Sequence, residues 1–477
     1  MFIDRIRNYT KKFNTKGIFW LIPISILGGI LNFFPHLNYP YLFHVDEWFH
    51  VTQAKQFVLG STINWYTGDV FHLEMERGWH LMLATIQYLF NLDITQWIFI
   101  PTVFQILAIL SVYLFVSRLL GKKEALISSL LIALLPSNAT IGGPVFLVPV
   151  NTCLIFIPLG LIFAFKLNNL KNTYNYISLF VLLTFTLYAY PPTAIILLTI
   201  IFLYFLQNIF SKDPNCRMNA TYLLITVFVS ILVSLPNFIY ELEQRGVESI
   251  KFNFWVFLEG LPLLLGIIPT IFFVLGFYLL FKNGKKEHLA ILFTALILIV
   301  NIIFFNNFGL SYLLPYQRTY IPLFLIMSII ASHGFIKLID LDKKKIGSIL
   351  LVLVLISTTV ISVHENINAN YYKIIDDDDY ENFLWIKENS PNNATILSDP
   401  WKARALATIA ERRVYAVMPF GPDEEQMKVV NSALNFLQQN CTNTSFLIDN
   451  NISIVYTNIC QNPNLMELKD NIYFFEK

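Results

Sequence analysis

The sequence predicts an α-helical polytopic membrane protein with about eleven transmembrane helices, followed by a small soluble α/β domain. Hydrophobic residues make up 55% of the 477 residues and charged residues only 14%, whereas a soluble domain carries about 25% charged residues. The apolar segments are also long enough for helices that cross a bilayer, and far longer than the strands of a barrel. A water-soluble globular protein is therefore excluded.

Eleven apolar segments form the predicted transmembrane helices. Their interiors hold almost no acidic or basic side chains, in keeping with the high cost of a charge inside the hydrocarbon core. The predicted helices span residues 17–34, 96–117, 124–141, 147–165, 175–191, 193–210, 219–239, 257–281, 289–305, 319–336 and 346–363.

The distribution of Lys and Arg predicts the orientation of these helices. Of the 33 basic residues, 19 lie in the N-terminal segment and five alternate loops, 5 lie in the intervening loops, and 9 lie in the tail after residue 363. Because basic loops stay in the cytoplasm, we expect a cytoplasmic N-terminus and an extracytoplasmic tail at the cell membrane. The apolar segment 78–92 is short, and counting it as a further span would place fourteen basic residues outside. We therefore expect this segment along the outer interface.

Two regions outside the predicted spans are large enough for chemistry. One is the first outer loop (35–96) of a transmembrane module that covers residues 1–363, and the other is an extracytoplasmic domain of residues 364–477. Alternating helix-like and strand-like segments predict the α/β fold of this domain. The predicted helices are 380–389, 401–411 and 423–438, and the predicted strands are 394–398, 414–417, 452–456 and 472–475. Cys441 and Cys460 are candidates for a disulfide on an oxidising side of the membrane.

The first outer loop gathers the residue types that carry chemistry. It holds five of the eight histidines and the acidic pair Asp46 and Glu47. Acidic residues at the start of a helix are favoured electrostatically, so helix capping alone can explain the pair. Carboxylates beside a bilayer with histidines near them also suit a catalytic site. A third interpretation is a divalent cation bound by Asp46, Glu47 and His50; no other cofactor is indicated.

The order of these features resembles the GT-C superfamily of membrane glycosyltransferases. That superfamily has a basic N-terminus, one helix, a long outer loop with an acidic pair, many further helices and a soluble tail. Arg77–Ala84, Leu89–Leu92, Ser117–Gly121 and Ala133–Pro136 resemble the protein O-mannosyltransferase and aminoarabinose transferase branch. In this chain a Gly-Trp pair stands where that branch usually has two prolines. Leu314–Pro322 resembles the arginine-bearing start of a late helix in the same superfamily.

The resemblance implies an inverting glycosyltransferase that moves a sugar from a polyprenyl-phosphate-linked donor to a hydroxyl of a glycan, lipid or protein on the outer face. Asp46 would be the general base, and Glu47 would orient or bind the acceptor. Arg318, with Tyr316 in the same turn, would bind the lipid phosphate, because guanidinium grips phosphate with two parallel hydrogen bonds. The alternative role of Arg318 is snorkelling to lipid headgroups. Further candidates for contacts with the substrate are Arg77, Lys55, Glu74, Glu76, His50 and His80.

Two other functions stay open from the sequence. An oligosaccharyltransferase-like enzyme for protein glycosylation is disfavoured because the loop 136–143 holds no acidic residue and the tail has no Trp-Trp-Asp motif. A transporter or lipid-glycan flippase predicts ionisable residues on helix faces or paired broken helices, which the sequence lacks. Apart from the bilayer and these substrates no partner is indicated, and a formal net charge of +1 offers nothing to attract nucleic acid.

Overall fold

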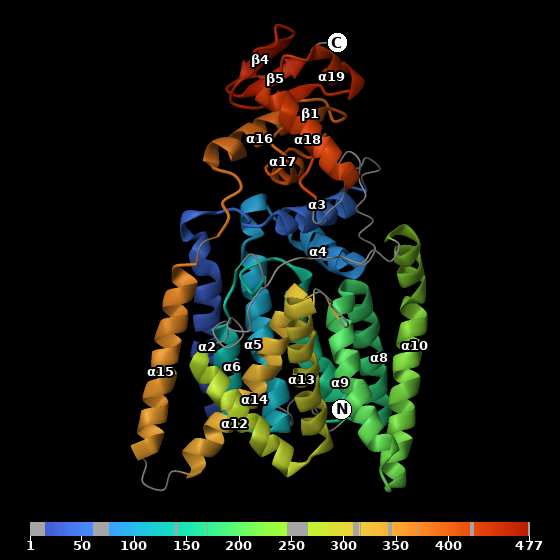
Figure 1. Ribbon diagram of the computed structural model, residues 1–477, viewed down its shortest axis with the longest axis vertical. Helices are drawn as coiled ribbons and strands as arrows, with labels where there is room; N and C mark the ends of the chain where they lie inside the picture. The colour runs from blue at the N-terminus through green and yellow to red at the C-terminus, as the bar shows by residue number, and fades with distance from the viewer. Residues whose placement is uncertain are drawn as a thin grey trace. The chain divides into compact units, whose positions relative to one another are not determined.

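The computed structural model describes residues 15–60, 76–138, 142–168, 170–245, 266–308, 314, 316–341, 346–369, 371–419 and 424–475. The chain divides into two compact units (Figure 1). The first consists of Met1–Asn38, Glu74–Gly78 and Ile98–Asn370, and the second of Tyr39–Leu73, Trp79–Trp97 and Tyr371–Lys477.

The first unit is built from helices. They are α2 (Thr15–Phe33), α5 (Phe99–Leu119), α6 (Lys122–Ala133), α7 (Cys153–Ala164), α8 (Asn172–Ala189), α9 (Pro191–Ile209), α10 (Pro214–Arg245), α12 (Ile267–Asn283), α13 (Lys286–Phe308), α14 (Tyr320–Leu341) and α15 (Ile346–Ile367). Short 3₁₀ helices are η1 (Phe34–Asn38), η4 (Pro149–Thr152) and η5 (Tyr316–Thr319). Within the described residues, every predicted transmembrane segment contains one of these helices.

Six stretches of the described chain are helical, long and apolar enough to cross a membrane. They are Phe19–Asn38, Ile94–Leu119, Pro191–Ile209, Pro214–Pro236, Lys286–Phe305 and Gln317–Asp340. Shorter apolar helical stretches are Pro149–Ala164, Ile267–Asn283 and Val352–Ile367. The protein is thus a mostly helical membrane protein, while the count of eleven crossings stays a prediction. Helix α4 (Arg77–Phe90), which matches the predicted interfacial segment, has 14 residues, fewer than the roughly 20 that a membrane span needs.

The predicted helix 124–141 is shorter in the structure, where α6 ends at Ala133. Pro136 follows, and a proline disfavours helical backbone in the residue before it. The chain then enters a buried loop whose backbone carbonyl groups accept hydrogen bonds from asparagine side chains. Asn151 Nδ2 donates to the carbonyls of Gly143 at 2.7 Å and Phe146 at 2.8 Å. Asn32 Nδ2 in α2 donates to the carbonyl of Pro144.

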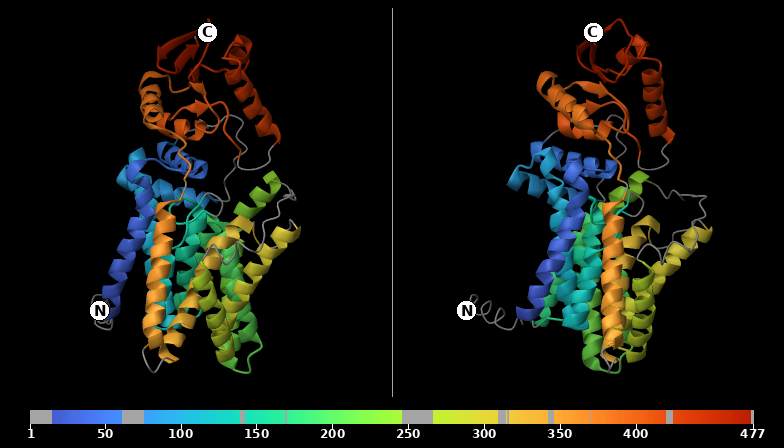
Figure 2. Two further views of the ribbon diagram at one scale, coloured as in Figure 1. Left: turned by 60° about the vertical axis from the view of Figure 1, so that its left-hand side comes forward. Right: turned by 90° about the vertical axis from the view of Figure 1, so that its left-hand side faces the viewer.

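Helices α12 and α14 pack against each other most closely at two glycines. A Cβ on Gly276 would collide with the carbonyl of Ile330, and one on Gly334 would collide with the carbonyl of Phe272. Small residues at such crossings let two helix backbones approach, which favours van der Waals packing between membrane helices. Helix α15 packs on α14 and α2 and runs beside the other long helices of this unit (Figure 2).

The second unit combines the outer loop with the C-terminal tail. Its helices are α3 (Val45–Leu59), most of α4, η3 (Ile94–Gln96), α16 (Asp377–Asn389), α17 (Ala403–Ala410), α18 (Glu424–Gln438) and α19 (Thr444–Asp449). Its strands are β1 (Thr395–Leu397), β2 (Arg413–Val414), β3 (Ile454–Tyr456), β4 (Leu465–Lys469) and β5 (Ile472–Phe475). The strand order is β2-β1-β3-β5-β4. Strand β1 is parallel to β2 and β3, whereas β5 is antiparallel to β3 and β4.

This division differs from the predicted one at residue 363. The prediction assigned the loop 35–96 to the transmembrane module, but in the structure most of it packs with the tail. The reason is that α17 of the tail packs against α3, where most residues from Glu47 to Ala54 are buried. The tail also contains α19 and β4, which were not predicted.

Candidate functional site

The acidic pair lies at the start of α3, where the two carboxylates have different surroundings. Glu47 is fully buried, and its Oε2 accepts hydrogen bonds from the backbone N–H groups of Phe43 at 3.0 Å and His44 at 2.9 Å. This is the reciprocal capping arrangement, in which the third helical residue reaches back to the N-cap. Glu47 therefore fixes the start of the helix, and its negative charge also suits the helix dipole.

The Asp46 carboxylate remains partly accessible. Its side chain is 16% exposed, and its Oδ1 lies 3.5 Å from Nδ1 of His44. The same ring nitrogen accepts the backbone N–H of Asp46 at 3.2 Å, which places the His44 ring beside the carboxylate. Of the two carboxylates, that of Asp46 is the more accessible.

Helix α3 is held in place by α17 of the tail. Arg404 is 1% exposed and donates to the carbonyls of Met418 at 2.5 Å and Val45 at 3.5 Å. Its guanidinium also lies over the ring of Phe49, 5.8 Å from the ring centroid. Thr408 donates to the carbonyl of Trp48 at 3.1 Å. These contacts fix the first two turns of α3 and so position Asp46.

Lys55, a predicted substrate contact, lies at the far end of α3 and is engaged with the tail. Its ammonium donates to the carbonyl of Thr408 at 3.1 Å and pairs with Glu411 at 3.2 Å, which Lys387 also contacts at 2.7 Å. Burial lowers the pKa of Lys55, and the charge of Glu411 opposes that shift. Burial raises the pKa of Glu411, but the two lysines outweigh it and the net pKa is lowered. Lys55 therefore has a structural partner, and its contact with a substrate stays a prediction.

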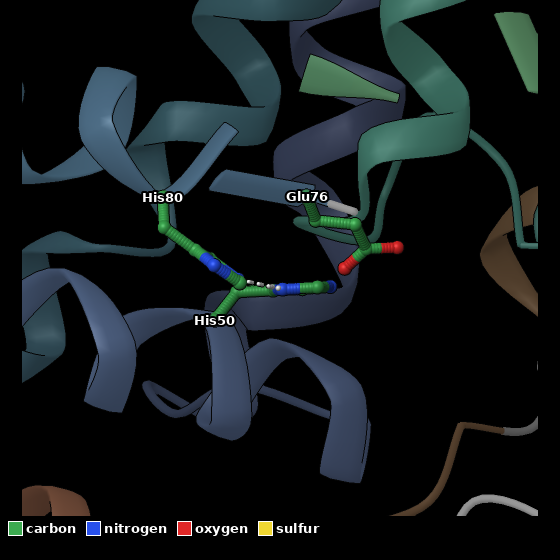
Figure 3. Close-up of side chains that lie close together, drawn as sticks. All are labelled: His50, Glu76 and His80. Atoms are coloured by element: carbon green, nitrogen blue, oxygen red, sulfur yellow. Dashed lines mark hydrogen bonds between the residues drawn. The ribbon is translucent and has the colours of Figure 1, made fainter. Parts of the chain in front are cut away.

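His50, His80 and Glu76 lie together. This group shares only His50 with the predicted metal-binding set of Asp46, Glu47 and His50. His50 and His80 are 4% and 1% exposed, and Nδ1 of His50 is hydrogen-bonded to Nε2 of His80 at 3.0 Å (Figure 3). Glu76 directly precedes α4, one helical turn before His80. Each of the three offers a ligand atom, and these atoms lie within 4.8 Å of one another. Burial and the neighbouring His50 lower the pKa of His80 well below its ordinary value.

The start of α4 packs tightly against α8. Arg77 is exposed, whereas Gly78 lies against the backbone at the end of α8. A Cβ at this position would come within 2.8 Å of the backbone nitrogen of Ala189, so glycine is needed for this close approach. Glu74 lies outside the described residues.

Arg318 and Tyr316 lie in η5, just before α14. Arg318 is half-buried. The turn is fixed by the buried Asn301, whose Nδ2 donates to the carbonyl of Leu314 at 2.9 Å and to Oγ1 of Thr319 at 3.1 Å. Buried amide hydrogen bonds of this kind hold a turn in one conformation, so the arginine projects from a defined backbone.

A mostly apolar cavity of about 370 Å³ lies in the first unit. It lies among the ends of α6, α12 and α15, and its polar lining comes mainly from α15. The lining residues are Leu131, Leu134, Pro136, Gly266, Ile267, Ile268, Pro269, Thr358, Ile361, Ser362, Glu365 and Asn366. Such a cavity has the chemical character that an aliphatic chain requires.

The two tail cysteines are free thiols in this structure. A hydrogen bond between them raises the pKa of the Cys441 thiol and lowers that of Cys460. The thiols are thus neighbours, and the disulfide between them stays a prediction.

Comparison with known proteins identifies the fold. No protein-family model matches the chain, and no curated protein matches its sequence. The oligosaccharyltransferase AglB of Archaeoglobus fulgidus superposes with a TM-score of 0.64 and 12% identity over 94% of this chain and 70% of that one. ArnT from Cupriavidus metallidurans bound to undecaprenyl phosphate superposes with a TM-score of 0.59 and 11% identity, over 94% of this chain and 97% of ArnT. The mycobacterial arabinofuranosyltransferase AftD superposes with a TM-score of 0.61 and 12% identity, over 94% of this chain and 37% of AftD.

All three proteins are GT-C glycosyltransferases. The chain has the GT-C fold, and the resemblance predicted from the sequence is confirmed at the level of the fold. At 11–12% identity the comparison does not carry over individual residues, so the assignment of roles rests on the geometry above.

Proposed function

We propose that the protein is a membrane glycosyltransferase that moves a sugar from a polyprenyl-phosphate-linked donor to an acceptor hydroxyl on the outer face of the membrane. The observation that carries this proposal is the GT-C fold over 94% of the chain, combined with a partly accessible carboxylate at the start of α3. ArnT, one of the similar structures, is bound to undecaprenyl phosphate. The apolar cavity of the first unit suits the chain of such a lipid.

The proposed reaction is a single displacement. The acceptor oxygen attacks the anomeric carbon while Asp46 takes the hydroxyl proton, and the bond from that carbon to the phosphate oxygen breaks. The lipid phosphate leaves with the electron pair of that bond. Because attack and departure occur on opposite sides of the carbon, the configuration of the sugar inverts. Glu47 cannot serve as the base without giving up the cap of α3, which leaves Asp46 for that role.

Replacement of Asp46 by Asn tests the base. The amide keeps the size of the side chain but cannot take a proton, so sugar transfer should fall by about 10²- to 10⁴-fold. The assay follows release of polyprenyl phosphate from lipid-linked sugars extracted from the cells that make the protein. Asp378→Asn is the matched control, since Asp378 is an exposed acid in α16. Turnover near that of the unmodified protein in Asp46→Asn would remove Asp46 from the mechanism.

Arg318 is proposed to stabilise the charge that develops on the departing phosphate. Replacement by Ala removes a charge-assisted contact of about 1.5–3 kcal/mol, so the donor KM should rise or kcat/KM should fall by roughly 10- to 100-fold. Arg217→Ala is the control, because Arg217 is exposed in the first turn of α10, at an end predicted to be cytoplasmic. If Arg318→Ala and Arg217→Ala give the same donor dependence, Arg318 acts on lipid headgroups instead.

An oligosaccharyltransferase activity is the second candidate, favoured by the similarity to AglB. The two functions differ in the acceptor nucleophile, an asparagine amide in one and a hydroxyl in the other. Incubation with a peptide that contains an N-glycosylation sequon, and with the same peptide carrying Gln for Asn, separates them. Transfer to the sequon peptide alone would favour the second candidate over the first.

A further inference from the structure

We propose that His50, Glu76 and His80 bind a divalent transition-metal ion, with Zn²⁺ as the ion that fits best. Two imidazole nitrogens and one carboxylate oxygen form a donor set that zinc accepts readily, and hard cations such as Mg²⁺ and Ca²⁺ prefer oxygen ligands. The group differs from the set Asp46, Glu47 and His50, because Glu47 is committed to the helix cap. The proposal does not depend on the function proposed above.

The distances suit an ion that enters with small side-chain movements. Ligand atoms bound at about 2.0–2.2 Å in tetrahedral geometry lie about 3.3–3.6 Å from one another. The three ligand atoms lie within 4.8 Å of one another, and the two histidine nitrogens are 3.0 Å apart. The histidine pair therefore has to open by roughly half an ångström. The Glu76 carboxylate, which lies on the far side of the His50 ring from His80 (Figure 3), has to move toward the ion.

The surroundings of the two imidazoles favour an ion. Phe49 packs edge-on to His80 with ring centroids 5.7 Å apart, and Trp79 packs edge-on to His50 at 6.1 Å. Trp79 and Phe49 are buried, so water has little access to the histidine pair. An apolar shell of this kind lowers the local dielectric and strengthens the attraction between a cation and its ligands.

The place of the group in the fold indicates its role. His50 lies one helical turn after Asp46 in α3, on the same face of that helix, and His80 lies in α4. A bound ion would join the two helices and fix the rotation of α3, which sets the direction of the Asp46 carboxylate. Three protein ligands leave one tetrahedral position for a fourth ligand.

Metal content and a spectroscopic signature test the site without any activity assay. The full-length protein in detergent is stripped with a chelator, incubated with ZnSO₄ and desalted, and bound zinc is measured by mass spectrometry. One equivalent per chain is expected. Co²⁺ in place of Zn²⁺ should give the intense visible absorption bands of a four-coordinate site. A stripped protein that retains neither ion would overturn the proposal, because it would show that the three residues form a hydrogen-bonded group only.

Variants identify the ligands. His50→Gln, His80→Gln and Glu76→Gln should each weaken zinc binding by at least about tenfold, since each loses one ligand or its charge. His364→Gln is the matched control, because His364 is exposed on α15, and it should bind zinc like the unmodified protein. Glu76→Gln keeps the size of the side chain and the histidine pair, so it remains informative if the histidine variants do not fold. Stoichiometric binding that survives all three changes would place the ion elsewhere.

Discussion

Asp46 and Glu47 are neighbours in the chain but face different environments, because successive residues of a helix point about 100° apart. Glu47 points back to the N–H groups that precede the helix, while Asp46 points to the side where His44 lies. The sequence offered capping and catalysis as alternative explanations of the pair. The structure assigns capping to Glu47, and the proposed chemistry stays with Asp46.

Arg404 shows what residue-level prediction misses. Arginine in a short helix of a soluble tail is expected at the surface, and no pattern in the sequence indicates that its helix would cover α3. Its burial becomes understandable only once Met418, Val45 and Phe49 surround it. Buried arginine of this kind is recognised from its partners, which come from segments far apart in the chain.

Removal of the Arg404 guanidinium should therefore destabilise the second unit. Arg404→Met keeps most of the apolar stem but leaves two carbonyl groups without their donor, at a cost of about 2–4 kcal/mol. Thermal unfolding of the full-length protein in detergent, followed by Trp fluorescence, measures the loss. Arg413→Met is the control, because Arg413 is exposed in β2 and should change the melting temperature little. Equal melting temperatures for both variants would contradict a structural role for Arg404.

At the scale of elements, apolar length predicts helices well and their ends less well. The eleven predicted segments each contain a helix because long apolar runs have no other stable form in a bilayer. The predicted helix 124–141 extends beyond the end of α6 at Ala133. The apolar run continues past Ala133, but Pro136 disfavours helical backbone there. Strand β4 was not predicted, since it is only five residues long and mostly exposed, and it lies at the edge of the sheet beside β5.

The glycine crossing of α12 and α14 gives a prediction at this scale. Gly276→Ala would drive a methyl group into the carbonyl of Ile330, so the two helices must separate and lose packing along their length. The folded yield after detergent extraction, measured by gel filtration, should drop markedly. Gly29→Ala is the control, because its Cβ would meet its nearest neighbour, Thr102, at an ordinary 3.6 Å. A monodisperse Gly276→Ala protein at normal yield would show that the crossing tolerates separation.

At the scale of the whole molecule, the fold is shared with GT-C enzymes at sequence identities of 11–12%. Lipid requires only that membrane helices be apolar, so most positions can change without altering the architecture. This explains why the order of helices, outer loop and tail in the sequence indicated the fold, whereas individual residues did not indicate it. The predicted boundary at residue 363 followed the membrane spans, but the packing of α3 on α17 depends on contacts between residues such as Thr52 and Thr408.

That packing has a consequence for biosynthesis. Thr52 and Thr408 are 356 positions apart, and a ribosome that adds about 5–20 residues per second needs roughly 20–70 s to reach the second after making the first. During that interval the loop that carries Asp46 has been translated, yet its supporting helix does not exist. A nascent or truncated chain thus carries the acidic pair without its scaffold, and the proposed active site matures only after α17 has been translated.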